Sequence, residues 1–113
     1  AGLLYEAHLP DDLNALRLSM DARREFYLLF KEAVNNVVKH AHATRARLDV
    51  TLAHKRLRME LADNGIGFDP MAHTDRNGLH NMQARARHLH GQLVVHSAPG
   101  AGTRYVLDFP LTT

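Results

Sequence analysis

Four polar residues in the segment 32–40 are of the types that hold a magnesium-bound phosphate. Glu32, Asn36, Lys39 and His40 are adjacent or lie three or four residues apart, so a helix would present them along one side. Carboxylate and amide oxygens suit Mg²⁺, and a lysine meets a phosphate as a point charge. The alternative is a solvated polar face with side-chain pairs at the same spacings.

A glycine-rich segment, Asp-Asn-Gly-Ile-Gly-Phe at residues 63–68, directly follows a predicted strand. Its two glycines let the backbone approach a flat or charged ligand closely. Asp63, at the end of the strand, could accept a hydrogen bond from an exocyclic amine such as that of adenine. The alternative is an ordinary Asp-Asn-Gly turn. The segment is neither a Walker A loop nor a full dinucleotide-binding fingerprint.

Two shorter segments add candidate ligand contacts. Asn77 and Gly78 lead straight into a predicted helix, whose N-terminal amides and dipole favour an anion. Residues 100–103, Gly-Ala-Gly-Thr, join two predicted strands and offer one hydroxyl, that of Thr103. Taken singly, the first segment is a helix cap and the second is a hairpin turn.

Other site chemistries find no support in the residues. The chain has no cysteine, which excludes disulfides, thiolate metal sites and a cysteine nucleophile. Nine histidines are present, but the pairs His40/His42 and His88/His90 are two residues apart on helical segments and therefore diverge. The chain has neither a zinc-protease pattern nor a serine in a nucleophile elbow.

The helix that must carry the first group of polar residues is predicted over residues 21–40. Ser19 is the expected N-cap, with Asp21 in the first turn. The apolar residues of this segment share one stripe at about 100° of rotation per residue; they are Phe26, Leu29, Phe30, Ala33 and Val37.

The remaining elements follow from changes in apolar periodicity. Residues 3–9 predict a short edge strand. Alternation over 48–52 and 57–61 predicts a β-hairpin joined by residues 53–56, and residues 63–77 are a loop. A second helix is expected over 79–90, with Leu79, Met82, Ala86 and Leu89 facing inward, and Gly91 ends it. Strands are expected at 93–97 and 104–109.

This order of elements predicts an α/β (α+β) sandwich, in which a mixed, mostly antiparallel sheet is covered on one face by helices. Too few helices separate the strands for a doubly wound parallel sheet. The length of 113 residues and the 45% apolar content suit one domain, residues 1–113. The chain begins with Ala1 and not Met, which favours a piece of a longer protein. A net charge of +2 is too weak to indicate a nucleic-acid partner.

Taken together and in this order, the motifs are specific. The sequence resembles the ATP-binding catalytic domain of bacterial sensor histidine kinases, within the GHKL superfamily that includes gyrase, Hsp90 and MutL. Residues 31–40 resemble the Asn box of the branch that controls NarL-type response regulators. Residues 63–67 resemble the first glycine box, residues 78–82 with Arg85 the second, and residues 97–103 the last. The resemblance implies the Bergerat-type ATP-binding fold.

The resemblance also implies roles at the adenine end of a bound ATP. Asp63 would bind the adenine amine, and Gly65 and Gly67 would shape the base pocket. Thr103 would lie near the adenine and contact it either directly or through water. Residues 69–77 would form a mobile lid over the nucleotide.

At the phosphate end, Asn36 would coordinate Mg²⁺ through its side-chain oxygen, and Glu32 would act on the metal through its waters. For Glu32, direct base catalysis and a plain surface pair with Lys39 or Arg24 are the alternatives. Lys39, His40 and the backbone of Gly78 and Leu79 would lie at the phosphates. Arg76 stands where the family often has glycine, and it could itself reach a phosphate.

The implied cofactors are ATP and Mg²⁺, and the implied activity is that of a protein histidine kinase. The γ-phosphoryl group would pass to a histidine on a dimerisation and phosphoacceptor domain of the same protein, and then to a NarL-type response regulator. The isolated domain is expected to be a monomer that cannot autophosphorylate. The full-length protein is expected to be a homodimer with this domain in the cytoplasm. An anchor in the inner (cell) membrane is compatible with this expectation. The alternatives are a nucleotide-binding regulatory module without turnover and a GHKL-type ATPase or serine kinase.

Overall fold

The structure is a computed structural model that describes residues 2–12, 16–72 and 78–111. Within these residues, the fold has five strands, two α-helices and one π-helical turn. In chain order they are β1 (Leu4–His8), α1 (Met20–Asn35), η2 (Asn36–His40), β2 (Arg45–Ala53), β3 (Arg56–Asp63), α2 (Leu79–His88), β4 (Gln92–Ser97) and β5 (Thr103–Pro110). The predicted sites Arg76 and Asn77 lie outside the described residues.

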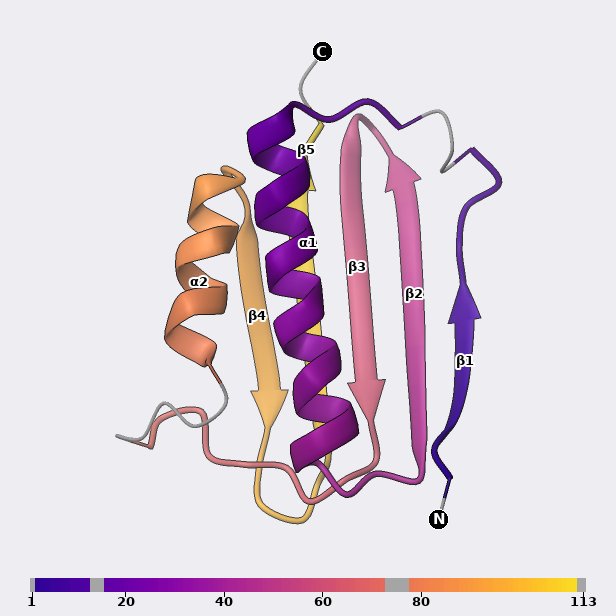
Figure 1. Cartoon of the computed structure of the whole chain (residues 1–113), viewed down its shortest axis with the longest axis vertical. Coiled ribbons are helices and arrows are strands. Elements are labelled where there is room, and N and C mark those ends of the chain that lie inside the picture. The colour runs from indigo at the N-terminus through magenta and orange to yellow at the C-terminus, as the bar shows by residue number, and fades with distance from the viewer. Residues whose placement is uncertain (1, 13–15, 73–77, 112–113) are drawn as a thin grey trace.

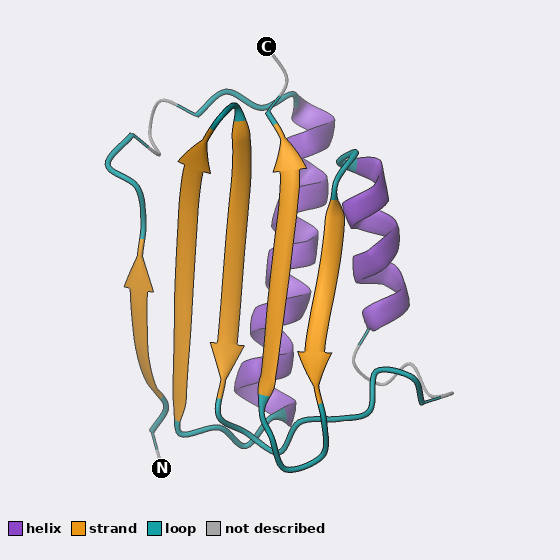
Figure 2. Cartoon of the chain, turned by 180° about the vertical axis from the view of Figure 1, so that it is seen from behind, coloured by secondary structure: helices purple, strands orange, loops and turns teal. Residues whose placement is uncertain are grey.

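The strands form one five-stranded sheet in the order β1-β2-β3-β5-β4. β1 pairs with β2 in parallel, and every other neighbouring pair is antiparallel. Both helices lie on the same face of the sheet, with α1 over its centre and α2 beside β4 (Figures 1 and 2). The predicted mixed sheet with helices on one face is therefore confirmed, and β1 is an edge strand as expected.

The β2–β3 hairpin is tighter than the sequence predicts. Ala53 pairs with Arg56, so only His54 and Lys55 form the turn, with φ of 54° and 60°. Two consecutive positive φ angles are typical of a type I′ turn, whose twist matches that of the flanking strands. The register places Leu48 opposite Leu61, so the alternating apolar residues of both strands share the face toward the helices.

Helix α1 begins where the sequence predicts and changes its winding near the end. Ser19 is the N-cap, and its hydroxyl accepts a hydrogen bond from the Ala22 amide at 3.1 Å. A continuous α-helix through residue 40 is wrong, because the chain widens into the π-helical turn η2 at Asn36. There the Ala41 amide donates to the Asn36 carbonyl at 2.9 Å, a bond that spans one residue more than an α-helical bond.

Helix α2 ends at His88 and is shorter than the predicted range 79–90. Leu89 still packs into the core, while His90 takes a φ of 60° and turns the chain toward β4. An ion pair of 3.1 Å between Arg85 and Glu25 joins α2 to α1.

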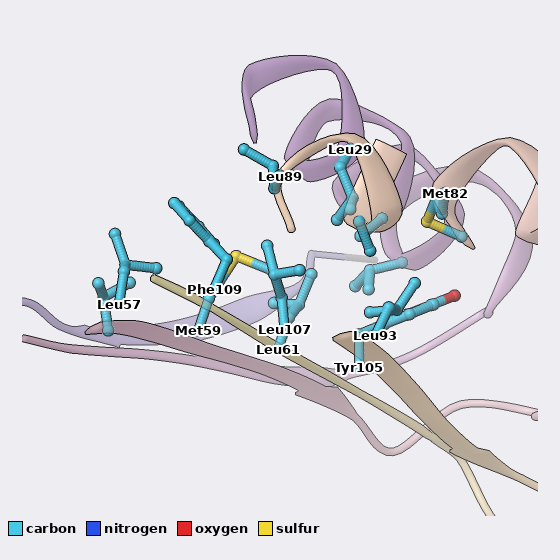
Figure 3. Packing of buried hydrophobic residues seen from close by; sticks show 14 residues of the cluster. Leu29, Leu57, Met59, Leu61, Met82, Leu89, Leu93, Tyr105, Leu107 and Phe109 are labelled. Carbon is cyan, nitrogen blue, oxygen red and sulfur yellow. The ribbon is translucent and has the colours of Figure 1, made fainter. Parts of the chain in front are cut away.

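The core fills the space between the two helices and the inner face of the sheet (Figure 3). Burial of these apolar side chains is the main force that holds the two layers together. The largest of the fully buried side chains are Tyr105, Phe109, Leu29, Leu57, Met59, Met82 and Leu107. The predicted inward residues of both helices belong to this core or pack against it.

The opposite face of the sheet is lined with charged side chains. Arg104 and Arg58 both reach Glu60, and Arg56 pairs with Asp108. The three arginines are about half exposed and the two carboxylates are partly exposed, so each pair contributes little to stability. In the part of the chain that the structure describes, no helix is long and apolar enough to cross a membrane.

Candidate functional site

At one end of the molecule, α1, β3 and β4 end and β5 and α2 begin (Figure 1). Residues from these segments line a cavity of about 480 Å³. Its wall combines residues from helix, sheet and loop that are far apart in the sequence. The lining residues are Asn36, His40, Ala41, Asp63, Ile66, Gly67, Phe68, Asp69, Pro70, Ala72, Leu79, Thr103 and Tyr105. No other described part of the chain gathers so many of the predicted site residues.

Asn36 stands at the start of η2, with only 4% of its surface exposed. Its side-chain amide donates a hydrogen bond to the hydroxyl of Tyr105 on β5 at 3.2 Å. This hydrogen bond restrains the Asn36 side chain, and the carbonyl oxygen of the amide lies at the end opposite to the bonded nitrogen. An oriented amide oxygen beside a cavity is a suitable ligand for a hard cation.

Tyr105 is a site residue that the sequence analysis missed. Burial is the main factor that raises the pKa of its hydroxyl to about 12, and the negative charges of Asp63 and Glu32 act in the same direction. The hydroxyl is therefore protonated at neutral pH and can both donate and accept hydrogen bonds. In the sequence, Tyr105 alternates with Leu107 and Phe109 along β5, so it looks like an ordinary core residue.

Asp63 ends β3 and borders the cavity as a hydrogen-bond acceptor. Its carboxylate accepts from the Gly65 amide at 2.8 Å, and the Thr103 amide also bonds to it. Burial raises the pKa of Asp63 above its ordinary value, and these two backbone bonds oppose the increase. The two amides hold the carboxylate in one orientation at the edge of the cavity.

The glycines of the first box are required because other backbone lies against them. A Cβ at Gly65 would lie 2.1 Å from the carbonyl oxygen of Ala41, and one at Gly67 would lie 2.1 Å from that of Ala98. Gly67 also has a φ of +66°, which L side chains rarely adopt. The loop thus passes closely between the end of η2 and the β4–β5 turn, which sets the width of the cavity.

Ser97 and Thr103 form a hydroxyl pair at the other side of this loop. Their oxygens are 2.8 Å apart, and the Ser97 hydroxyl also donates to the Gly102 carbonyl at 3.0 Å. The amide of Phe68, next to the glycine box, donates to the Ser97 oxygen at 2.9 Å. Thr103 is 5% exposed and borders the cavity.

Glu32 lies against the N-cap of α2. A Cβ added to Gly78 would be 2.8 Å from the Glu32 carboxyl carbon, and Gly78 has a φ of +63°. Among the residues that the structure describes, Glu32 forms no ion pair with Lys39 or Arg24, which disfavours the surface-pair interpretation. Its carboxylate instead lies beside a helix N-terminus, where negative charge is favourable.

The structure brings most of the predicted site residues to this cavity. Those that line it are Asn36, His40, Asp63, Gly67, Leu79 and Thr103. Three others do not line the cavity and make the contacts described above: Gly65, Gly78 and Glu32. Lys39 is exposed to solvent and does not line the cavity.

The donors present fit Mg²⁺ better than a transition metal. Within the described residues, no group of three or more His, Cys, Asp or Glu side chains could hold a metal ion. The amide oxygen of Asn36 and the carboxylate of Glu32 are a small set of hard oxygen donors. Such a small set is expected where Mg²⁺ is held mainly by substrate phosphates and water.

Named relatives are similar to most of this chain. Residues 21–113 match the family described as histidine kinase-, DNA gyrase B-, and HSP90-like ATPase. The sensor histidine kinase MctS of Rhizobium johnstonii is 36% identical over 97 residues, which cover 82% of this chain and 21% of MctS. The nitrate/nitrite sensor protein NarQ of Escherichia coli is 34% identical over 107 residues, which cover 91% of this chain and 19% of NarQ. This chain therefore spans about a fifth of the length of either relative.

Solved structures of histidine kinases share the fold. The histidine kinase domain of the blue-light activated kinase of Erythrobacter litoralis has a TM-score of 0.80 at 19% identity, covering 96% of this chain and 52% of that chain. The kinase AdeS of Acinetobacter baumannii has a TM-score of 0.73 at 14% identity, covering 98% of this chain and 55% of AdeS. Because the family match spans most of the chain, the resemblance drawn from the four motifs is confirmed. The chain belongs to the histidine kinase-, DNA gyrase B- and HSP90-like ATPase family, as an ATP-binding catalytic domain of the kind found in sensor histidine kinases.

Proposed function

We propose that this domain binds ATP with Mg²⁺ and donates the γ-phosphoryl group to a histidine on a separate dimerisation domain, for relay to a NarL-type response regulator. The observation that carries the proposal is one cavity bordered by both Asn36 and Asp63. These are the residues expected at the metal end and at the adenine end of one ATP molecule. A cavity of about 480 Å³ is within the usual range for a small-molecule site.

At the adenine end, the Asp63 carboxylate accepts a hydrogen bond from the exocyclic amine, and Thr103 contacts the base beside it. Gly65 and Gly67 have no side chains, so the loop leaves space in the cavity for the flat base. The fixed orientation of the Asp63 carboxylate supports this role, because an acceptor held by two backbone amides costs little to organise on binding.

At the phosphate end, the first amides of α2 and the backbone of Gly78 and Leu79 surround the phosphates. Lys39 and His40, on the exposed side of η2, meet the same phosphates as cations or donors. For Arg76, contact with a phosphate stays a prediction, since that residue lies outside the described part of the chain.

Asn36 holds Mg²⁺ through its side-chain oxygen, and Glu32 orders water on the metal. When bound, Mg²⁺ neutralises charge on the phosphate oxygens as the γ-phosphoryl group leaves. The residues of the chain then contribute by holding the nucleotide in one position relative to the acceptor histidine. A neutral imidazole already carries a free lone pair near pH 7, so direct base catalysis by Glu32 is the weaker option.

The partners are supplied by segments outside this domain. The dimerisation and phosphoacceptor domain of the same protein brings the histidine, so the isolated domain is a monomer that does not autophosphorylate. The full-length protein is a homodimer that places this domain in the cytoplasm. An anchor in the cell membrane belongs to the same proposal. The names of two relatives, a sensor histidine kinase and a nitrate/nitrite sensor protein, support a role in signalling.

A nucleotide titration with and without Mg²⁺ tests the binding step. The domain is expected to bind ATP with a Kd between about 1 μM and 1 mM. Asn36→Ala should lower the Mg²⁺-dependent affinity by about tenfold or more. Gln92→Ala removes an exposed side-chain amide at the start of β4, outside the cavity; it is the control and should leave this affinity unchanged. The absence of saturable binding at millimolar ATP would contradict the proposal.

The phosphoryl acceptor is tested by mixing the domain with a purified dimerisation domain and labelled ATP. Acid-labile label on the partner's histidine supports the proposal. Label on serine, release of free phosphate alone, or binding without turnover would contradict it and select one of the alternative activities. In the same assay, a partial loss in Glu32→Gln that extra Mg²⁺ restores supports the water-ordering role. A near-complete loss with intact ATP affinity would indicate a base.

A further inference from the structure

The hydroxyl of Ser97 has three polar neighbours at the edge of the cavity. It lies at the end of β4, 2.8 Å from the Thr103 hydroxyl oxygen and 3.0 Å from the Gly102 carbonyl oxygen. The backbone amide of Phe68 is 2.9 Å from the same Ser97 oxygen. Ser97 therefore connects the glycine-rich loop to the strand that carries Thr103.

The direction of each of these hydrogen bonds follows from the groups involved. A carbonyl oxygen only accepts and an amide only donates, and a serine hydroxyl has one proton and two lone pairs. The Ser97 proton goes to the Gly102 carbonyl, so one lone pair accepts from Phe68 and the other accepts from Thr103. The single hydroxyl proton of Thr103 is thereby directed at Ser97.

Thr103 consequently has only lone pairs left for a ligand. The other polar side chain at this end of the cavity, Asp63, is also an acceptor, fixed by the amides of Gly65 and Thr103. Two acceptors side by side suit a base that presents an amino group there. A base with a carbonyl oxygen in the same place would meet lone pairs with lone pairs.

We propose that Ser97 is a positioning residue for the choice of base: by accepting the Thr103 proton, it holds Thr103 as an acceptor and makes the site select aminopurine over oxopurine nucleotides. The inference rests on the proposed function, because it concerns the same nucleotide site. Ser97 does not itself line the cavity, so its proposed effect on the choice of base is exerted through Thr103.

A purely structural role makes a different prediction. Ser97 also accepts from the Phe68 amide, so its loss loosens the glycine-rich loop. That loss would weaken the binding of every nucleotide by the same factor. Only a change in the ratio between two bases reports on the direction of the Thr103 hydroxyl.

The experiment compares ATP with inosine triphosphate, which carries a carbonyl oxygen in place of the adenine amine. The measured quantity is the ratio of the two dissociation constants. In Ser97→Ala the freed Thr103 hydroxyl can rotate and donate to the inosine carbonyl, so discrimination against inosine triphosphate should fall by about tenfold. Ser97→Thr keeps a hydroxyl and should keep the original ratio. Thr51→Ala removes an exposed hydroxyl from β2 and is the matched control.

Equal losses for both nucleotides in Ser97→Ala, or an unchanged ratio, would overturn the inference. Thr103→Val gives a second measurement that leaves the Phe68–Ser97 bond in place. It should weaken ATP binding without improving the binding of inosine triphosphate, and a ratio equal to that of the unchanged domain would also overturn the inference. If the unchanged domain did not bind ATP, the proposed function would fail, and this inference with it.

Discussion

At the scale of single residues, Asp63 meets two opposing demands. Its proposed role in adenine recognition needs a hydrogen-bond acceptor, while burial at the end of β3 makes ionisation of this carboxyl costly and raises its pKa. Because the charged Asp63 side chain is costly for the stability of the fold, replacing it with a residue of similar shape should raise stability while it weakens binding.

We expect Asp63→Asn to stabilise the domain at neutral pH and to weaken ATP binding by about tenfold. Because the folded-state pKa is raised, the stability that Asp63 contributes is fully present below its ordinary pKa of 3.8 and is lost as the pH rises through the raised value. The gain in the variant should therefore grow from acidic toward neutral pH. Urea unfolding at several pH values measures it.

Asp12→Asn, an exposed carboxylate in the turn after β1, is the control for the change of charge alone. Its unfolding free energy should not show the same dependence on pH. A loss of stability in Asp63→Asn at neutral pH would show that the two backbone bonds outweigh the cost of burial.

Tyr105 is expected to act through Asn36. Tyr105→Phe removes the acceptor of the Asn36 amide and leaves the ring in the core, so the unfolding free energy should fall by only about 1 kcal/mol. The Asn36 oxygen loses its fixed direction, and several times more Mg²⁺ should be needed to reach half-maximal ATP binding. Titrating Mg²⁺ at constant ATP measures this shift.

Tyr27→Phe removes a hydroxyl from a tyrosine that is 58% exposed on α1, and it should change neither quantity. An unchanged Mg²⁺ requirement in Tyr105→Phe would show that packing alone holds Asn36 in place.

At the scale of elements, the glycine-rich loop fits between two other pieces of backbone. Gly67 and Gly100 both have positive φ, so alanine at either position should cost about 1 kcal/mol of backbone strain. A Cβ at Gly67 also meets the Ala98 carbonyl, whereas a Cβ at Gly100 has nothing within 4 Å. Gly67→Ala should therefore lower the melting temperature more and also abolish ATP binding. Gly100→Ala should lower it by about 4–8 °C and leave binding intact.

Calorimetric melting and the ATP titration distinguish these outcomes. If Gly67→Ala and Gly100→Ala changed the melting temperature and ATP binding equally, strain at positive φ would account for both changes. Close packing of the loop would then not set the width of the cavity.

The elements differ in how far the sequence predicts them. The alternation of Leu57, Met59 and Leu61 predicts β3, since every second side chain must reach the core. The π-helical turn at Asn36 leaves no such trace, because it changes the hydrogen-bond spacing by one residue without changing the types of side chain. The order of the motifs predicts several of the residues that line the cavity. The bond from Asn36 to Tyr105 depends on how η2 is placed against β5, which only the folded chain determines.

At the scale of the whole molecule, the two edges of the sheet are protected unequally. β4 pairs antiparallel with β5 and is covered by α2, whereas every residue of β1 is exposed. Local opening of a strand costs less where few contacts hold it. We expect the β1 amides to exchange with deuterium much faster than those of β4, with β3 slowest because it lies between β2 and β5.

Hydrogen exchange followed by mass spectrometry or NMR compares the three strands in one experiment, and β4 serves as the internal control for an edge position. Equal protection of β1 and β4 would show that the parallel pairing of β1 is as strong as the covered antiparallel edge.

The two-residue turn between β2 and β3 also bears on the order in which the chain folds. Closing so short a loop costs little chain entropy, and hairpins of this kind form in about 1–10 μs. The pairing of β1 with β2 spans the whole of α1, so it must overcome a much larger entropy of loop closure. The sheet should therefore grow outward from its central hairpin, with the N-terminal strand joining after the nucleotide-binding end has already taken shape.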